Sequence, residues 1–297
     1  MSPDMHASAA LWSVSIEAAL VVLAFIYLRG WYRLRKIRQI AAPAWRPSAF
    51  LCGQLMVYAV IASPLASLDL QWLTAHMIQH LVLMTLAAPL ILLGEPVLMF
   101  RNSLPAHFDT AEPGRLLQHA PIRRIGRVLA NPVFCWFAGT ACIIVWHLPV
   151  PFNLSMRSSA WHHFEQISFF AAGLFFWWPV VQPWPSIASR ERWSIPMYLF
   201  LATLPCDALS AFLAFCGRVV YLMYVSSNQL LNDSALRDQE LAGALMWTWV
   251  TFAYLIPAVF ISMQILAPAN TPGGRLPRAA WPAPEAHSLN SGAAEDL

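Results

Sequence analysis

The sequence predicts an all-α, polytopic membrane protein with seven transmembrane helices, its N-terminus outside and its C-terminus in the cytoplasm. Apolar residues make up 58% of the 297 residues and charged residues only 11%, and the mean hydropathy is +0.53. A soluble domain carries about 25% charged residues. The charges here are sparse enough to leave long uncharged runs. The five cysteines include no CxxC pair, so neither a disulfide framework nor a zinc knuckle is expected.

Seven apolar stretches approach or exceed the roughly 20 residues that a membrane-spanning helix needs. They cover residues 11–28, 49–68, 72–93, 132–149, 161–181, 194–215 and 240–265. The uncharged runs define several of them, because no Asp, Glu, Lys or Arg lies between Arg46 and Asp69 or between Arg127 and Arg157. The first stretch is the weakest, since it contains Glu17.

The basic residues are distributed unevenly among the connections. Fifteen of the 18 Lys and Arg residues follow the first, third and fifth spans or lie in the C-terminal tail. The other three are Arg157, Arg218 and Arg237. The positive-inside rule places the first group in the cytoplasm and the second group outside. Basic residues follow the first span, the reverse of a cleavable signal peptide, so we expect an uncleaved anchor.

The chain is expected to divide into a transmembrane domain at 1–266 and a disordered cytoplasmic tail at 267–297. The tail is rich in Pro, Gly and Ala, a composition typical of disorder. Within the longer cytoplasmic loop at 94–131, basic and apolar residues at 115–127 favour a short helix on the membrane surface. The basic clusters are short and lie between apolar spans, so nucleic acid is not expected as a partner.

The ionisable residues within the spans lie on one side of the predicted membrane. At about 1.5 Å per residue, all of them fall in or near the outer half of a span. Such groups are costly in a membrane and usually face a partner or a cavity. We therefore expect several helices to form a polar pocket that opens to the outside. For Glu17 and Asp207, pairing with a histidine or with backbone groups is an equal alternative.

Helix spacing indicates which side chains share a face. His76 and His80 are four residues apart and lie on one face, which Met84 continues one turn deeper. Such a pair can chelate one ion, and a hydrogen-bonded pair that bridges two helices is the alternative. His162 and Glu165 are three residues apart, which suits a metal ligand beside a carboxylate that fixes its tautomer.

The predicted pocket combines imidazole and thioether groups. Gln239, Gly243 and Met246 form one stripe of the last span, where the glycine permits close helix approach. Imidazole and thioether ligands together suit copper, Cu(I) especially, whereas magnesium or calcium would need more oxygen donors. The expected metal ligands are His76, His80, His147, His162, Met84 and Met246. The residues expected to line the pocket or orient the ligands are Glu17, Glu165, Asp207, Asp238 and Gln239.

Several longer motifs occur in order along residues 10–265. They include His76-Met77-Ile78-Gln79-His80, Leu93-Gly94-Glu95-Pro96, Trp146-His147-Leu148-Pro149, Phe176-Trp177-Trp178-Pro179 and Asp238-Gln239-Glu240-Leu241-Ala242-Gly243. Together they resemble the seven-span CtaG family of cytochrome c oxidase assembly proteins. The fifth span of that family carries a His, a Glu three residues later and often a further His. His162 and Glu165 fit this pattern, while Gln166 stands in the last position.

The resemblance implies a multi-pass protein of the bacterial inner membrane that is needed to assemble haem-copper oxidase and supplies or inserts its copper. It implies an assembly role and not an enzyme. The implied partners are haem-copper oxidase subunits and the lipid bilayer, with periplasmic copper chaperones as candidates. Copper enters such oxidases from the outer side of the membrane, which agrees with the predicted pocket.

Two other function classes stay open. In the first, histidines from different spans ligate a b-type haem that exchanges electrons with quinone. In the second, Glu17, Glu165 and Asp207 form the relay of a channel or proton-coupled transporter. The second class is weakened because all three acids lie in the predicted outer half and no cytoplasmic half-pathway is visible.

Overall fold

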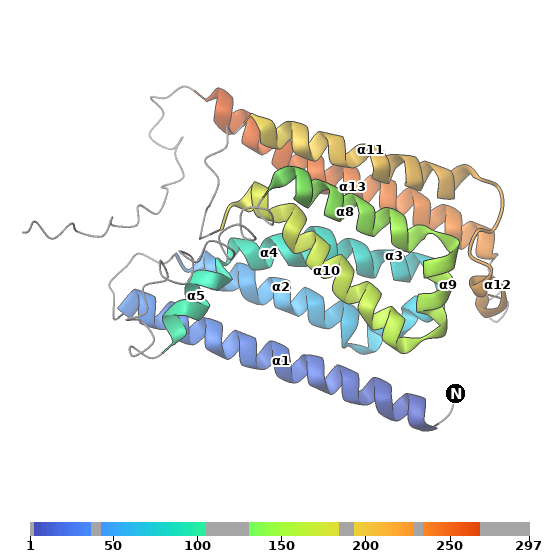
Figure 1. The fold of residues 1–297 in the computed structure, drawn as a ribbon, viewed down its shortest axis with the longest axis horizontal. Helices are drawn as coiled ribbons and strands as arrows, with labels where there is room; N and C mark the ends of the chain where they lie inside the picture. Colours follow the sequence, from blue (N-terminus) through green and yellow to red (C-terminus); the bar gives the residue numbers. More distant parts are fainter. Residues whose placement is uncertain (1–2, 37–42, 105–130, 184–192, 229–233, 268–297) are drawn as a thin grey trace, which may run out of the picture.

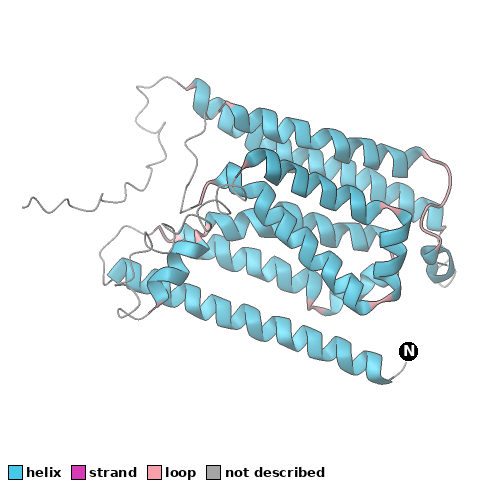
Figure 2. Ribbon diagram, in the orientation of Figure 1, coloured by secondary structure: helices cyan, strands magenta, loops and turns pink. Residues whose placement is uncertain are grey.

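The structure is a computed structural model, and it describes residues 3–36, 43–104, 131–183, 193–228 and 234–267. Every regular element in these ranges is a helix, and none is a strand (Figure 2). The all-α prediction is therefore confirmed for the part of the chain that the structure describes. The surface helix predicted at 115–127 and the tail predicted beyond residue 267 lie outside these ranges.

Five helical segments are long and apolar enough to cross a membrane. They are Trp12–Lys36 within α1 (Pro3–Lys36), the segment Leu73–Leu93, α10 (Ser159–Val181), α11 (Ser194–Phe215) and α13 (Ala235–Leu266). These helices form one bundle, with α1 at one edge and α11 at the opposite edge (Figure 1). The chain is therefore a multi-pass membrane protein.

A sharp bend ends α8 (Pro132–His147), which fills most of the fourth span predicted at 132–149. The next helix, α9 (Pro149–Arg157), lies beyond that span, and its axis differs from that of α8 by 73°. Leu148, between them, has an extended backbone with ψ of 141°, which is the conformation that a residue before proline prefers. Pro149 has no N–H to continue the hydrogen bonding of α8. If the bent pair counts as one span, the structure has six candidate spans.

The predicted second span is shorter than expected. Helix α2 covers Trp45–Ile61, and its 17 residues rise about 26 Å, less than a hydrocarbon core of about 30 Å. The 3-10 helix η1 (Pro64–Leu70) replaces the predicted end of this span. The proline at position 64 explains the break, because it disfavours helical backbone at Ser63. The count of seven spans is therefore not confirmed, and five or six are supported.

The segment Leu73–Leu93 contains a change of helix type. It consists of α3 (Leu73–Leu81), the π-helix η2 (Val82–Ala87) and α4 (Ala88–Leu93). At the end of η2, the Ala88 N–H bonds the carbonyl oxygen of Leu83, five residues earlier. The same pattern would pair the Met84 oxygen with Pro89, which has no N–H. Trp177 of α10 supplies the missing donor, because its Nε1 lies 2.9 Å from the Met84 oxygen.

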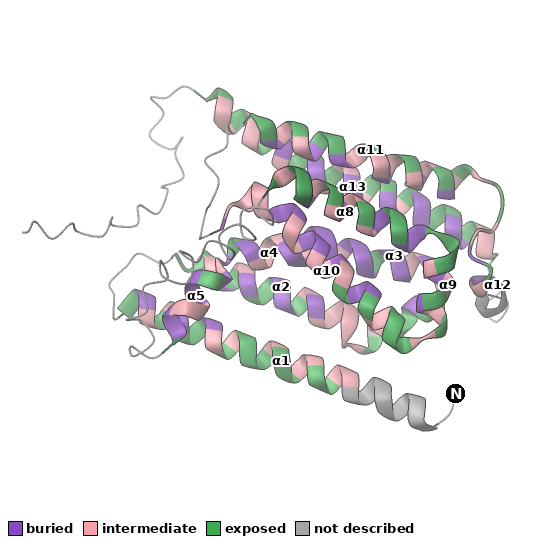
Figure 3. Ribbon diagram, viewed as in Figure 1, coloured by how far each residue is buried: buried purple, intermediate pink, exposed green. Residues whose placement is uncertain are grey.

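Leu73–Leu93 is the central segment of the bundle. Within its most apolar stretch 61% of the residues are buried, against 11% for α1 (Figure 3). Gly173 of α10 packs closely against this segment, since a Cβ there would lie 2.9 Å from Met84 Cα. Gly243 allows a similar approach between α13 and α11, since a Cβ there would lie 2.9 Å from the Ser210 oxygen. The close approach predicted at Gly243 is confirmed.

The two ends of the bundle carry different elements. The N-terminal end of α1, α9 and the short helix α12 (Met223–Asn228) lie at one end, called the α9 end below (Figure 1). Helix α5 (Pro96–Ser103) and the C-terminal end of α13 lie at the other end (Figure 1). The described chain thus begins at the α9 end and finishes at the opposite one. Which end faces the cytoplasm stays a prediction.

Candidate functional site

Helices α3 and α10 bring together His76, His80 and Glu165, called the His–Glu triad below. The Nε2 atoms of the two histidines lie 2.9 Å apart. Oε1 of Glu165 lies 3.5 Å from His76 Nε2 and 3.4 Å from His80 Nε2. All three side chains are buried. The four-residue spacing turns both imidazoles to one face of α3, and α10 places the carboxylate against them.

Three polar atoms of the triad have no hydrogen-bond partner among the described residues, namely Nδ1 of His76, Nδ1 of His80 and Oε2 of Glu165. Buried polar atoms are usually paired, so these three atoms need partners that the described residues do not supply. Two imidazole nitrogens 2.9 Å apart also require a proton or a cation between them. One ligand atom from each triad residue lies within 4.8 Å of the others, which is close enough to hold one metal ion.

A second group of ligand atoms extends the triad toward η1. Oδ2 of Asp69 lies 3.1 Å from His162 Nε2. Asp69, His76 and His162 also offer ligand atoms within 4.8 Å of one another, so His76 belongs to both groups. The triad together with Asp69 and His162 is called the polar cluster below. Asp69 is absent from the predicted site, and its signal in the sequence is that no other charged residue lies between Arg46 and Glu95.

Neighbouring elements hold the Asp69 backbone in place. The hydroxyl of Tyr224, in α12, donates to the Asp69 carbonyl oxygen at 2.8 Å. Burial raises the pKa of Tyr224 well above its usual value, and the carboxylates of Asp69 and Asp238 raise it further. The phenol therefore stays a neutral donor. Gln79 stabilises the backbone of η1 in a similar way, because its Nε2 donates to the Ala66 carbonyl oxygen at 3.0 Å.

Gln166 borders the polar cluster, at the position where the sequence resemblance led us to expect a histidine. Its Nε2 lies 3.4 Å from His162 Nε2 and 3.4 Å from Gln79 Oε1. The side chain is buried, and its Oε1 has no partner among the described residues. The position therefore belongs to the site, but it provides an amide, whose oxygen suits harder ions than an imidazole does.

Four of the predicted metal ligands line a separate small cavity one turn deeper in the bundle. This inner cavity has a volume of about 20 Å³ and is lined by His80, Met84, His147 and Met246, together with Cys206, Thr85 and mostly apolar residues. His80 is the link, because its Nε2 contacts the polar cluster while its ring also lines the cavity. The six predicted ligands therefore divide between two adjacent places.

Asp238 and Gln239 anchor backbone and do not contact the polar cluster directly. Asp238 accepts hydrogen bonds from the backbone N–H of Leu73 at 2.7 Å and from the Thr74 hydroxyl at 2.6 Å. It thereby caps the first turn of α3, which its own N-cap residue leaves uncapped. Gln239 accepts from the Val220 N–H at 2.7 Å and donates to the Arg218 oxygen at 3.0 Å. Both residues position the elements around the cluster.

Glu17 and Asp207 are not brought to the polar cluster. They lie on α1 and α11, at opposite edges of the bundle (Figure 1). Glu17 is partly exposed, and one buried carboxylate oxygen of Asp207 has no partner among the described residues. His163, next to His162, turns away to stack on Trp12 of α1 with ring centroids 4.0 Å apart.

The Leu93-Gly94-Glu95-Pro96 motif builds a second polar contact, outside the predicted site. Glu95 adopts a left-handed conformation with φ of 51°, and its Oε1 lies 2.8 Å from Arg46 Nη2. Burial raises the pKa of Glu95, and the nearby Arg46 guanidinium partly offsets this rise. The Tyr27 hydroxyl donates to the Gly94 oxygen at 2.7 Å. This motif joins α1, α2 and α5 and has a structural role.

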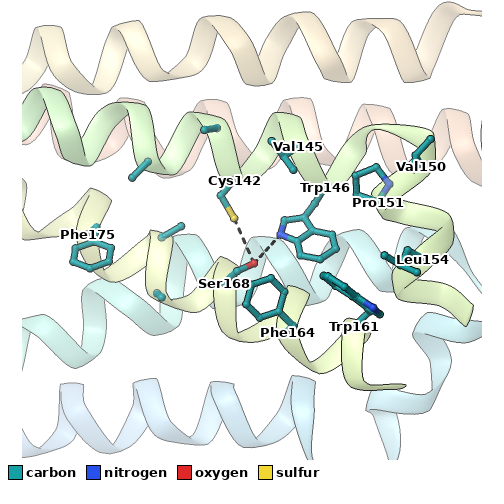
Figure 4. Close-up of a pocket in the computed structure, with 14 residues that line it drawn as sticks. Cys142, Val145, Trp146, Val150, Pro151, Leu154, Trp161, Phe164, Ser168 and Phe175 are labelled. Carbon is teal, nitrogen blue, oxygen red and sulfur yellow. Dashed lines mark hydrogen bonds between the residues drawn. The ribbon is translucent and has the colours of Figure 1, made fainter. Parts of the chain in front are cut away.

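An apolar groove of about 620 Å³ runs between α8, α9 and α10 and contains none of the predicted site residues. Figure 4 shows the indole of Trp146 and the thiol of Cys142 converging on Ser168 within it. Trp146 Nε1 lies 2.7 Å from Ser168 Oγ, and Cys142 Sγ lies 3.7 Å from the same oxygen. The lining is otherwise apolar, which suits the hydrocarbon of a membrane better than a metal ion.

Proteins from mycobacteria are similar to most of this chain. The chain is 26% identical over 263 residues to an uncharacterized protein of Mycobacterium leprae, and 26% identical over 258 residues to one of Mycobacterium bovis. The alignments cover 85% and 84% of the chain, which spans only 38% of the length of either relative. No solved structure matches the chain. Residues 25–267 match the family described as cytochrome c oxidase caa3 assembly factor (Caa3_CtaG), and the chain therefore belongs to that family.

Proposed function

We propose that this chain is a non-catalytic assembly factor of the bacterial inner membrane, which binds copper in its polar cluster and passes it to a haem-copper oxidase subunit. Its family supports the assembly role. The observation that carries the copper role is the buried contact of His76, His80 and Glu165, whose ligand atoms lie within 4.8 Å of one another. Metal-ligating groups buried in a membrane point to function.

The donor set of the polar cluster fits copper. It offers three imidazoles and two carboxylates from η1, α3 and α10. Imidazole suits copper and zinc, whereas magnesium and calcium prefer a shell of oxygen ligands. A buried carboxylate lowers the free-energy cost of bringing a cation out of water. Two carboxylates among the ligands therefore favour loading of a cation in a low-dielectric bundle.

The cluster has an order that suits delivery. Asp69 in η1 and His162 in the first turn of α10 are its members nearest the α9 end, and they are positioned to take up the ion. His76 belongs to this group and to the triad, so the ion exchanges ligands without leaving the cluster. Glu165 balances its charge at the deeper position. With the predicted orientation, the α9 end faces outward, where copper reaches the oxidase.

A haem site is less well supported by the geometry. A bis-histidine haem needs two imidazoles on opposite sides of a porphyrin. His76 and His80 come from one helix, and their Nε2 atoms are only 2.9 Å apart. The inner cavity beside His80, at about 20 Å³, is far smaller than a porphyrin.

Metal analysis and the visible spectrum of the purified full-length protein test this proposal. We expect copper to bind in a defined ratio to protein and no Soret band to accompany it. The His76→Ala/His80→Ala double variant should lose this copper, while a His163→Ala variant should keep it. A Soret band, or copper binding that is unchanged in the double variant, would refute the proposal.

A further inference from the structure

We infer that the inner cavity is a second metal site, selective for Cu(I) and separate from the polar cluster, with His147, Met84 and Met246 as its ligands. The inference rests on the proposed copper function and adds to it a second site and a preferred oxidation state. Five elements meet at this cavity: the segment Leu73–Leu93, α8, α10, α11 and α13.

The size of the cavity suits a single ion. Its volume is about 20 Å³, and a single water molecule needs roughly 10–15 Å³ of such space. Several core residues close it, including Phe169 and Tyr254. Phe169 stacks on His80 with ring centroids 3.9 Å apart, which fixes that imidazole between the cavity and the polar cluster.

One ring nitrogen of His147, Nε2, has no hydrogen-bond partner among the described residues. Its Nδ1 lies 2.7 Å from the Ile143 carbonyl oxygen, so Nδ1 carries the proton and Nε2 keeps its lone pair. This Nε2 is buried, and no described residue donates a hydrogen bond to it. Histidines that ligate metals usually have the other ring nitrogen held by a carbonyl or carboxylate in this way. Leaving a buried acceptor unpaired is unfavourable, so a ligand at Nε2 is favoured.

Sulfur atoms supply the remaining ligands. Met84 comes from the π-helix η2, Met246 from α13 and Cys206 from α11, and all three are buried. Thioether and thiol groups select Cu(I) over harder ions. Methionine also serves as a core filler, but filling alone gives no partner to the His147 Nε2. The coincidence of two methionines and a bare imidazole nitrogen on one small cavity is what favours a soft metal site.

The two sites differ in the charge of the residues that form them. The polar cluster contains the carboxylates of Asp69 and Glu165, whereas no Asp or Glu lines the inner cavity. A monovalent ion is therefore the better match for the neutral cavity, because a buried divalent charge without an anion is strongly disfavoured. His80 lies between the sites and contacts both.

An anaerobic titration of the full-length protein with Cu(I), followed by copper X-ray absorption, tests the inference. We expect sulfur among the atoms bound to copper in the unaltered protein. A Met84→Leu/Met246→Leu variant should lose this sulfur signal, and its Cu(I) affinity should fall about 10-fold or more. Leucine nearly conserves the volume of methionine, so little strain is expected. Met99→Leu is the matched control, because Met99 is fully buried in a different cluster beside Tyr27.

The outcomes separate this inference from the copper function itself. Glu165→Gln should weaken the polar cluster yet keep the sulfur-bound Cu(I). Copper bound only through nitrogen and oxygen overturns the inner site and leaves the polar cluster standing, whereas no copper at all overturns both. Sulfur that persists in the double variant also overturns the assigned ligands. If the double variant does not accumulate, each single Met→Leu variant should remove one sulfur from the copper shell, and an unchanged shell in both refutes the site.

Discussion

Glu165 determines the charge of the His–Glu triad. Its Oε1 lies within 3.5 Å of both imidazole Nε2 atoms, and its Oε2 has no partner among the described residues. With both histidines neutral, the triad carries one negative charge. A monovalent ion cancels this charge, and a divalent ion leaves one positive charge that Asp69 can offset from the neighbouring group. The carboxylate therefore favours loading by balancing charge, in addition to the ligands that the two imidazoles provide.

Replacing either histidine of α3 should remove most copper binding. His76→Ala or His80→Ala leaves a single imidazole on this face of the helix, which ends the chelation by two adjacent ligands. Copper retained after gel filtration measures the effect. His163→Ala is the control, since His163 stacks on Trp12 and takes no part in the polar cluster. Equal losses at His76 and His163 would contradict the geometry.

Replacing Glu165 by glutamine should weaken binding without emptying the site. The change keeps the shape of the side chain and removes its charge. We expect copper affinity to fall on the order of 10–100-fold, the range for residues that orient metal ligands. Competition with a chelator of known affinity provides the measurement, and the unfolding temperature of the metal-free variant checks that the fold is intact. An unchanged affinity would show that Glu165 only supports packing.

The sequence predicts which side chains share one helix face more reliably than which side chains meet across different elements. The i, i+4 spacing correctly places His76 and His80 together, because it depends on one helix alone. Asp69 is not predicted, since its position depends on the 3-10 helix η1 that turns the chain back over α3. Spacing also cannot show that His147 and Met246 meet at a separate cavity. That grouping depends on how neighbouring helices are rotated and packed.

Helix α3 is stabilised from outside its own sequence. Its N-cap residue, Trp72, makes no side-chain cap, and Asp238 of α13 accepts from the Leu73 and Thr74 N–H groups instead. The carboxylate also favours the positive end of the helix dipole. This contact ties the start of α13 to the turn that precedes His76. The Asp-Gln pair of the sequence motif is thus explained by helix capping and loop anchoring.

Removing this cap should destabilise the bundle. Asp238→Ala leaves the Leu73 and Thr74 N–H groups without their acceptor, while the Thr74 hydroxyl keeps the backbone oxygen of residue 238. We expect a loss of about 1–2 kcal/mol in the free energy of unfolding. Thermal unfolding of the purified protein in detergent measures this as a lower midpoint. Glu240→Ala, an exposed acid two residues along α13, should change stability by no more than about 0.5 kcal/mol. Equal midpoints for the two variants would contradict the capping role.

Apolar patterning predicts where helices lie better than where they change type. A proline could have signalled the break that the sequence analysis did not anticipate, which follows α2 before Pro64. Pro149 marks the bend between α8 and α9, where the predicted fourth span ends. The π-helix η2 is harder to foresee. It depends on a donor from another helix, Trp177 Nε1, that satisfies the Met84 oxygen opposite Pro89. A window of hydropathy contains no information about such a contact.

The orientation of the whole bundle is testable because its two ends differ. The described chain starts at the α9 end and its last helix, α13, ends at the opposite end (Figure 1). The uneven distribution of basic residues predicts that this opposite end is cytoplasmic. A reporter that is active only in the cytoplasm should be active when fused after Leu266 and silent when fused after Arg157. The reverse pattern would place the polar cluster in the cytoplasmic half and contradict delivery from outside.

Deleting the gene should impair the oxidase without stopping synthesis of its subunits. An assembly factor that delivers copper acts after the polypeptides are made, so membranes should contain the subunits but show low haem-copper oxidase activity. Added copper should restore part of this activity, because a higher copper concentration compensates for a lost carrier by mass action. Complementation with the His76→Ala/His80→Ala variant should fail, whereas the His163→Ala variant should succeed. Normal oxidase activity in the deletion strain under copper limitation would contradict the copper role. An activity loss that added copper does not change would favour a function in assembly unrelated to the metal.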